Sequence, residues 1–487
     1  MQITNWKNAA KILFFALLIY LPLFLHLDKM VIGIWDESRV VHTTMEMADN
    51  HQWFVPYFGG KPDTWSTKPP LLIWLQVFFV SLLGAKELAF RLPSAIAAAL
   101  TCMTLMGYCL RYLKSYLLGL LTCAVLVTST GYIALHVTRT CEYDSLLIGE
   151  MVVYALAFFR YTQTEKNKWL YLFFIALTFA GLTKGIAALI AMPGIALYAL
   201  LSQKILSLLK NKHSYVGMAI FVCFVGAYYL VRESLTPGYL AIMWENDAAG
   251  RFKAVSEVYE TSAYWYLELI EREGFHYWLL GVPIGLYVGY AHKDKHIQQL
   301  TLFSFCFCAC YLLIISLSKT KLPWYHAPLY PFMALWVALA IRHFFQFIKD
   351  SVNFNKGLRY PYFAHVLLLL LFISPYFAIM SQVYFPKYPT AAVEEYGFEI
   401  SDWLRKNPKT DLTKYVLLYR GYAPHLSFYT TYIKPIATKS LEELTVGDVV
   451  VVVQNDLKEA LKTRFVLRKI KAEEFMEIWE IVEKKEG

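Results

Sequence analysis

The charged segment Trp35-Asp36-Glu37-Ser38-Arg39 closely follows an apolar run at roughly residues 9–27. Lys68-Pro69-Pro70-Leu71 comes soon afterwards. In a chain otherwise rich in apolar residues, charged side chains at a membrane boundary are costly, so they are functional candidates by default. We therefore expect the chemistry of this protein to lie at one face of a membrane.

Composition places the chain among polytopic membrane proteins. Its 487 residues are 57% hydrophobic and only 17% charged, whereas soluble domains are about 25% charged. The formal net charge of +9 does not indicate nucleic-acid binding, because the basic residues form short clusters between apolar runs, as in cytoplasmic loops. The eight cysteines include no C-x-x-C pair and are interpreted as small apolar residues.

Apolar runs predict the transmembrane helices. A span takes about 20 residues, with a range near 17 to 25, so we expect about eleven to thirteen spans. The clearest runs lie at roughly residues 9–27, 89–110, 116–135, 145–162, 169–183, 185–201, 214–235, 276–291, 300–317, 323–345 and 362–382. Leu71–Ala85, at about 15 residues, is marginal for a span and is interpreted as an interfacial helix of the first outer loop.

The distribution of positive charge orients the chain. If Leu71–Ala85 lies in the interface, every basic loop falls on one side, as cytoplasmic loops do. These loops carry Lys7/Lys11, Arg111/Lys114, Arg160/Lys166/Lys168, Lys204/Lys210/Lys212, Lys293/Lys295 and Arg342/Lys349/Lys356/Arg359. We therefore expect a cytoplasmic N-terminus and an uncleaved first span. The segments expected on the outer face are residues 28–88, 136–144, 183–185, 236–275, 318–323 and those after about 383.

The character of the sequence changes near residue 386, which predicts two domains, 1–385 and 386–487. In the second, Glu394-Glu395 and Asp402-Trp403-Leu404-Arg405 look helical, Tyr415–Tyr419 and Val449–Val453 look like buried strands, and helical patterns lie between and after them. The prediction is a small α/β domain outside the membrane. About 100 residues is short for a self-sufficient core, so we expect it to lean on the membrane domain.

Three acids are candidate catalytic groups of the outer face: Asp36, Glu37 and Asp144. Acids at helix N-termini often only cap the helix. The functional interpretation is that a half-desolvated carboxylate, Asp36 above all, has a raised pKa that suits a general base, with its charge steadied by Arg39. Asp144 adds a second carboxylate on the same face.

Cations from distant segments are expected on that face: Lys68, Lys184, Arg251, Lys319 and Lys321. A single lysine at the end of a span usually extends to the lipid headgroups. However, Ser318-Lys319-Thr320-Lys321 precedes Leu322-Pro323-Trp324-Tyr325 on a side where positive charge is normally depleted. Such a cluster indicates an anionic ligand, and phosphate suits lysine.

Other kinds of site receive little support. His136 and His326 are candidate metal ligands, but neither HExxH nor a DxD triplet is present and their spacing follows no metal motif. A divalent metal is therefore possible but not indicated, and no cofactor is expected to be required. The absence of P-loop, GxSxG and GxGxxG motifs disfavours nucleotide hydrolysis and serine esterase chemistry.

An ordered series of motifs resembles a known family. It comprises Asp36-Glu37-Ser38-Arg39, residues 47–57, Gly59-Gly60-Lys61-Pro62, Lys68-Pro69-Pro70-Leu71 and Arg91-Leu92-Pro93-Ser94-Ala95, with sparser matches at Arg139, Asp144, residues 181–185, Gly250-Arg251-Phe252 and residues 318–325. The series is similar to the bacterial aminoarabinose lipid A transferases and their undecaprenyl-phosphate-sugar transferase relatives, which belong with protein O-mannosyltransferases to the C-type glycosyltransferases.

The resemblance implies an active site that faces outward from a bacterial inner (plasma) membrane and uses a polyprenyl-phosphate sugar. By similarity, Asp36 is the acceptor-side catalytic carboxylate, Asp144 a second active-site acid, and Lys68, Arg251 and Tyr325 bind the donor phosphate. Arg139 and Lys184 are supporting residues. One departure is Thr67, which stands where aminoarabinose transferases typically have an acid that takes part in a metal site. This departure weighs against a bound zinc and against aminoarabinose as the sugar.

The residues and the resemblance together predict an inverting glycosyltransferase that moves one sugar to an envelope acceptor, whether lipid A, another glycan or a protein. The alternatives are a transporter or flippase, an envelope binding protein, and a polymerase or ligase of lipid-linked glycans. Transporters usually carry inverted repeats and ionisable residues at the bilayer midplane. Neither feature is evident here.

Overall fold

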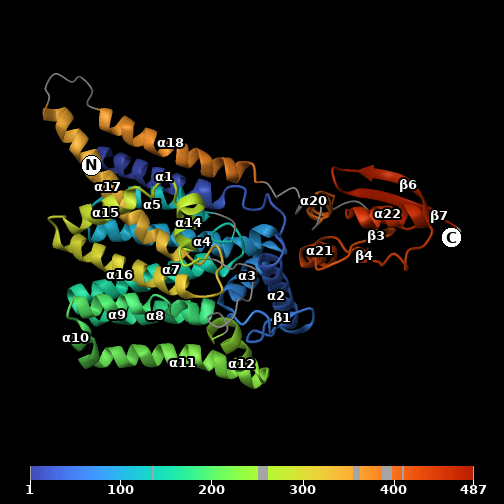
Figure 1. Cartoon of the computed structure of the whole chain (residues 1–487), viewed down its shortest axis with the longest axis horizontal. Helices are drawn as coiled ribbons and strands as arrows, with labels where there is room; N and C mark the ends of the chain where they lie inside the picture. The colour runs from blue at the N-terminus through green and yellow to red at the C-terminus, as the bar shows by residue number, and fades with distance from the viewer. Residues whose placement is uncertain are drawn as a thin grey trace.

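The structure, a computed structural model, describes residues 2–133, 136–249, 262–354, 362–386, 397–407 and 411–485. Long helices lie side by side in a bundle, and a small sheet formed by the C-terminal residues stands beyond one end of it (Figure 1). The short helices α2 (Asp36–Asn50) and α3 (Leu71–Leu83) lie at that end, between the bundle and the sheet. The chain is a polytopic helical membrane protein with a small α/β part, as predicted.

Seven helices in the described part of the chain are long and apolar enough to cross a membrane. They are α4 (Glu87–Arg111), α7 (Tyr143–Thr164), α8 (Asn167–Lys184, continued by the 3₁₀ turn η1, Gly185–Leu189), α11 (Lys212–Leu235), α16 (Lys295–Leu317), α17 (Tyr330–Phe354) and α18 (Phe363–Tyr384). The other four predicted spans overlap α1 (Gln2–Phe24), α5 (Tyr116–Val127), α9 (Met192–Leu201) and α15 (Gly281–Tyr290). Every predicted span thus contains a helix, but these four have shorter apolar stretches than the sequence suggested.

Helix α3 covers the marginal stretch Leu71–Ala85. Its 13 residues rise about 20 Å at 1.5 Å per residue, which is less than the ~30 Å hydrocarbon core. Pro70 precedes the helix, and Gly84 ends it at a φ of 80°, a conformation that glycine adopts without strain. The length agrees with the prediction of a helix that does not span.

Helices α7 and α8 form an antiparallel hairpin. Glu165 ends α7 in the left-handed conformation and donates its N–H to the Tyr161 carbonyl, and α8 begins at Asn167. With so short a turn the helices pack back on each other, so the start of α7 and the end of α8 lie at the same end of the bundle. This arrangement brings together residues about 40 positions apart.

The remaining elements of the membrane segment are short. They are β1 (Tyr57–Phe58), β2 (Lys61–Pro62), α6 (Thr130–Ile133), α10 (Ile205–Lys210), α12 (Tyr239–Met243), η2 (Trp244–Ala249), α14 (Trp265–Leu269), η3 (Ile270–Gly274) and η4 (Ala327–Leu329). Strands β1 and β2 pair in an antiparallel hairpin with Gly59 and Gly60 at its turn, both at positive φ. That hairpin lies beside α2 (Figure 1).

The C-terminal sheet has five strands in the order β4-β3-β5-β7-β6. The predicted strands are β3 (Tyr415–Leu417) and β5 (Val449–Val452), which pair in parallel, and β4 (Ala437–Thr438) lies parallel to β3. Helices α20 (Phe398–Lys406) and α22 (Asn455–Arg464) were also expected, and α21 (Pro424–Phe428) leads into the turn η5 (Tyr429–Ile433). Glu394-Glu395 lies outside the described residues.

The sheet has two long strands beyond the two that the sequence predicted. Residues Phe465–Ala472 and Glu477–Lys484 form the antiparallel strands β6 and β7. Both are rich in Lys, Arg and Glu, which favour helices in isolation, but facing strands pair these charges. Arg468 bonds Glu480 and Lys469 bonds Glu477. Cross-strand pairing therefore overrode the local preference.

The C-terminal segment packs on the membrane segment, as its small size suggested. One apolar cluster contains Ile32 and Phe90 from the first segment together with Phe398, Phe428 and Tyr429 from the last. Because the two parts share a core, the domain division at residue 386 stays a prediction.

Polar contacts strengthen the same interface. Tyr429 donates its hydroxyl to Glu87 at 2.6 Å and accepts the Ile32 N–H at 2.9 Å. Arg405 donates to the carbonyl oxygens of Asp28 and Lys29 at 2.7 and 3.0 Å. The C-terminal segment therefore fixes the loop that leads to Asp36.

Candidate functional site

A cavity of about 380 Å³ opens at the end of the bundle nearest α2 and α3, within the range of roughly 300–1,000 Å³ that is usual for small-molecule sites. Its walls come from several distant segments of the chain. The polar groups among them are Asp36, Arg39, Thr67, Lys68, His136, Glu142, Asp144, Lys184, Glu245 and Asp247, and the aromatic ones are Trp65, Tyr143, Trp324 and Tyr325. The structure thus brings together Asp36, Asp144, Lys68 and Lys184, four of the charged residues that topology had placed on one face.

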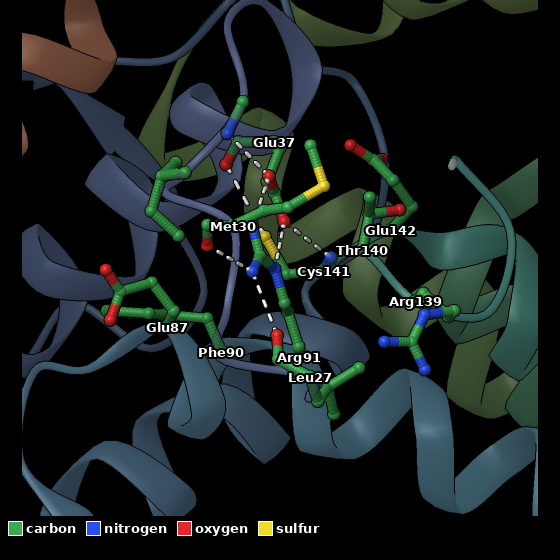
Figure 2. Close-up of polar contacts among 12 residues, drawn as sticks. Leu27, Met30, Glu37, Glu87, Phe90, Arg91, Arg139, Thr140, Cys141 and Glu142 are labelled. Atoms are coloured by element: carbon green, nitrogen blue, oxygen red, sulfur yellow. Dashed lines mark hydrogen bonds and ion pairs between the residues drawn. The ribbon is translucent and has the colours of Figure 1, made fainter. Parts of the chain in front are cut away.

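A buried ion pair holds the start of α2. The Arg91 guanidinium donates to both carboxylate oxygens of Glu37, at 2.8 and 3.0 Å. The Glu37 carboxylate also accepts the backbone N–H groups of Gly33 at 2.6 Å and Cys141 at 3.3 Å. Figure 2 shows this network around Arg91. Glu37 is not among the residues that line the cavity. Its contacts anchor the start of α2, and the catalytic role expected for it stays a prediction.

Arg91 also satisfies the chain that leaves the first helix. Its Nη1 atom donates to the carbonyl oxygens of Leu27 and Met30, and its Nη2 atom to that of Val31, at 2.7 to 2.9 Å. A planar guanidinium suits such a convergent set of acceptors. One side chain of α4 therefore fixes both the loop before Asp36 and the helix that begins with it.

Asp36 meets His136 across the cavity. The Asp36 Oδ2 atom lies 3.4 Å from His136 Nε2, and the His136 ring stacks on Trp324 with centroids 3.4 Å apart. The backbone is unusual near both groups. Trp35, the residue before Asp36, has a φ of 66°, and His136 itself has a φ of 82°. Positive φ is strained for such residues and persists where the surroundings enforce it, often at functional sites.

The pKa of Asp36 is lowered, whereas a raised pKa was expected from the sequence. Burial favours its neutral form, but the hydrogen bond from His136 and the charge of Lys68 outweigh burial and lower its pKa. The pKa of Glu142 moves the other way: burial raises it to about 8, despite the opposing charge of His136. Asp36 is therefore the ionised carboxylate of the pair, and Glu142 is the one with high proton affinity.

Asp144 and Lys184 join α7 and α8 at the cavity. Lys184 Nζ donates to Asp144 Oδ1 at 2.6 Å, and both side chains are largely buried. The ammonium of Lys184 also lies 5.5 Å from the ring centre of Tyr325, and that of Lys68 lies 5.1 Å from the ring of Tyr143. Lys68, Lys184 and Tyr325 thus lie together, which fits the expected anion site.

Two arginines serve other partners than those expected. Arg39 lines the cavity, but it pairs with the buried carboxylate of Asp63, with Nε at 3.1 Å from Oδ2, and so does not steady the charge of Asp36. Arg139 donates to the carbonyl oxygens of Pro22 and Leu25 at 2.7 and 2.8 Å. It thereby satisfies carbonyl groups at the end of α1.

Two of the predicted cations, Lys319 and Lys321, are not among the described residues that line the cavity. Lys321 is buried and donates to the Ser318 carbonyl at 2.8 Å, while Lys319 is exposed. Neither is among the lining residues, although Leu322, Trp324 and Tyr325 of the same loop are. Arg251 lies outside the described residues, so its predicted role stays a prediction.

Thr67, the residue that departs from the family pattern, is buried in the wall of the cavity. Its hydroxyl donates to Asp247, and its backbone carbonyl accepts the hydroxyl of Tyr239 at 2.7 Å. Asp247 belongs to η2, so this pair links the loop that carries Lys68 to the segment before Arg251.

A group of metal-ligating side chains lies in the cavity. One potential ligand atom each from Asp36, His136 and Glu142 lies within 4.8 Å of the others. In the sequence, His136 was a candidate ligand only together with His326. His326 is not among the residues that line the cavity, and burial lowers its pKa to about 4. Glu142 was missed, although its spacing from Asp144 provides a signal: two acids two residues apart at the start of a helix on the outer face.

Comparisons with known proteins agree with this fold. Residues 67–229 match the family model described as dolichyl-phosphate-mannose-protein mannosyltransferase. The undecaprenyl phosphate-alpha-4-amino-4-deoxy-L-arabinose arabinosyl transferase of Aeromonas salmonicida is 26% identical over 347 residues, which are 69% of this chain and 60% of that protein. The corresponding enzyme of Pectobacterium carotovorum is 25% identical over 72% of this chain and 63% of its own. The matches thus span less than two thirds of these relatives.

The solved structure of ArnT from Cupriavidus metallidurans bound to undecaprenyl phosphate superposes with a TM-score of 0.70 at 15% sequence identity, over 98% of both chains. This agreement shows that the fold is shared along essentially the whole chain. The resemblance noted in the sequence, to aminoarabinose transferases and their mannosyltransferase relatives, is confirmed.

Proposed function

We propose that this chain is an inverting membrane glycosyltransferase that moves one sugar from a polyprenyl-phosphate donor to an envelope acceptor. The observation that carries the proposal is the single cavity in which Asp36 and Asp144 lie with Lys68, Lys184 and Tyr325. The relatives named as undecaprenyl-phosphate sugar transferases and the fold shared with a protein bound to undecaprenyl phosphate support the same class of donor.

In this proposal the cavity faces outward from the bacterial inner membrane and the N-terminus is cytoplasmic. The support is the distribution of basic residues, which places the loops at the opposite end of the bundle in the cytoplasm. The donor enters from the lipid, its tail remains among the apolar helices, and its phosphate lies against Lys68 and the Lys184–Tyr325 pair. Arg251 of the neighbouring loop is proposed as a further phosphate ligand on the strength of the resemblance.

The residues divide the reaction between two sides of the sugar. Lysine charges stabilise the phosphate that leaves as an anion, which needs no protonating acid. On the opposite face, Asp36, whose lowered pKa keeps it ionised, orients the acceptor hydroxyl and accepts its proton as that oxygen attacks the anomeric carbon. A single displacement of this kind inverts the anomeric centre. Asp144 acts by holding Lys184 in place.

Mass spectrometry of envelope lipids, glycans and proteins from cells with and without the gene tests the proposal. We expect one envelope component to lose the mass of a single sugar in the deletion strain, with the lipid-linked donor accumulating. Loss of a whole glycan chain would instead indicate a polymerase or ligase. An unchanged envelope with a lipid-linked sugar confined to the inner leaflet would indicate a flippase.

A further inference from the structure

A buried carboxylate atom without a hydrogen-bond partner lies beside Asp36. Glu142 is 2% exposed, and its Oε1 atom has no hydrogen-bond partner among the described residues. Figure 2 shows Glu142 apart from the contacts of Arg91 and Glu37, with no dashed line to its carboxylate. Burying a carboxylate oxygen unpaired is costly, so such an atom in a folded protein calls for a ligand or a catalytic role.

Two further potential ligands converge on Glu142. Atoms of Asp36 and His136 lie within 4.8 Å of it and of one another. His136 Nδ1 is also buried, and no described residue forms a hydrogen bond with it. The strained backbone of His136 and of Trp35, next to Asp36, shows that the fold holds two of the three side chains in place against a local preference. The cluster is therefore built by the fold and not by chance proximity on a flexible surface.

The charge of the cavity also favours a cation. Its described lining includes five acidic side chains (Asp36, Glu142, Asp144, Glu245 and Asp247) but, besides His136, three basic ones (Arg39, Lys68 and Lys184). Arg39 is already paired with Asp63, which lies outside this set. A phosphate-bearing substrate would add to the excess of negative charge. A divalent ion would offset it at the point where the carboxylates are densest.

We propose that Asp36, His136 and Glu142 bind a divalent first-row transition-metal ion. The 3.4 Å between Asp36 Oδ2 and His136 Nε2 is about the separation of two ligands of a tetrahedral ion at ~2.1 Å. Imidazole suits zinc, and carboxylates suit manganese, so these two ions are the natural probes. Binding displaces the protons held by the cluster.

Three protein ligands leave a coordination position open, as in catalytic metal sites. An acceptor hydroxyl in that position would be acidified by the ion, with the second oxygen of Asp36 available to receive its proton. This step deepens the proposed transfer reaction, but occupancy of the site does not depend on that reaction. Binding can therefore be measured with no sugar present.

The test uses the full-length protein, purified in detergent and stripped with a chelator. Metal content after addition of Zn²⁺ and removal of the excess is measured by mass spectrometry, affinity by calorimetry, and nitrogen ligation by electron paramagnetic resonance with Mn²⁺. The variants are Glu142→Gln and His136→Gln. The matched control is Glu245→Gln, which removes an exposed carboxylate from the same cavity but leaves the three ligands intact.

We expect the wild type and the Glu245→Gln variant to retain one ion per chain. Each ligand variant should lose more affinity than the roughly 10–100-fold that removal of a supporting second-shell partner costs. The His136→Gln variant should also lose the nitrogen coupling. Absence of a bound ion in the wild type, or an equal loss of affinity in Glu142→Gln and Glu245→Gln, would overturn the site and show a proton-sharing or diffuse acidic cluster. Thermal unfolding of each metal-free variant establishes that it is folded.

Discussion

Lys184 and Asp144 form an ion pair of 2.6 Å although 40 residues separate them. The pair sits where the last turn of α8 meets the first turn of α7, and both side chains are about nine-tenths buried. The ion pair holds the ammonium group of Lys184 at the cavity wall, beside Tyr325. The pair is thus the structural basis for a fixed cation at the proposed phosphate site.

A double-mutant cycle measures this coupling. Lys184→Met and Asp144→Asn should each destabilise the protein by about 3–5 kcal/mol, because each leaves a buried charge without its partner. The double variant should be less destabilised than the sum of the two, by roughly 0.5–3 kcal/mol. Unfolding in detergent is the measurement. Additive losses would show that the two charges do not depend on each other.

Replacement of Asp36 by Asn should remove most of the turnover and leave the protein folded. Loss of a positioned proton acceptor costs about 10²–10⁴ in rate, and the amide retains the size of the carboxylate. The matched control is Asp49→Asn, on the exposed opposite end of the same helix, which should transfer sugar at the wild-type rate. Transfer by the Asp36→Asn variant within a few-fold of wild type would refute the role of this carboxylate.

Lys68→Ala should weaken use of the lipid-linked donor. A lysine that binds a phosphate acts as a point charge, so its loss should raise the KM for the donor, and Lys68→Arg should restore part of the activity. Lys61→Ala, in the exposed strand β2 of the same loop, serves as the control. If the donor KM is equal in the two alanine variants, the phosphate is bound elsewhere.

Arg91→Met should destabilise the protein by about 3–5 kcal/mol, since Glu37 would remain as a buried charge without its partner. Three backbone carbonyls would also lose their donor. Arg111→Met, at the exposed end of the same helix, should have little effect. Thermal unfolding in detergent compares the two, and similar midpoints would contradict the anchoring role assigned to Arg91.

Tyr429→Phe should loosen the C-terminal segment. Removing the phenolic hydroxyl leaves the Glu87 carboxylate and the Ile32 N–H without this partner. An unsatisfied buried group costs about 1–3 kcal/mol. Limited proteolysis should then cut the C-terminal segment faster than in the wild type. Tyr422→Phe provides a comparison at a more exposed tyrosine; an equal rate of cleavage in both variants would argue against the interface described here.

Sequence reasoning located those parts of the site that depend on topology alone. The count of apolar runs placed Asp36, Lys68, Asp144 and Lys184 on one face, and the structure brings them into one cavity. The sequence did not indicate the ion-pair partners of the charged groups, because the packing of the folded chain determines which side chains meet. The partner of Glu37 is Arg91, 54 residues away, and Arg39 pairs with Asp63 and not with Asp36.

The same limit explains the pKa of Asp36. Proximity to a membrane surface predicted a raised value, because only burial is evident in the sequence. His136 lies 100 positions along the chain and, with Lys68, reverses the direction. Glu142 takes the raised pKa instead, chiefly because it is buried, and its Oε1 atom has no hydrogen-bond partner in the described part of the chain. Which of several neighbouring acids is ionised depends on contacts that no linear pattern encodes.

Sugar transfer by the purified protein in liposomes tests directly whether the chain moves one sugar from a polyprenyl-phosphate donor to an envelope acceptor. The donor is the pool of lipid-linked sugars extracted from a deletion strain, and the acceptor is the unmodified envelope fraction of that strain. We predict that the wild type releases one polyprenyl phosphate for each sugar gained by the acceptor, and that Asp36→Asn releases almost none. No release of polyprenyl phosphate by the wild type, or equal release by the variant, would contradict the account.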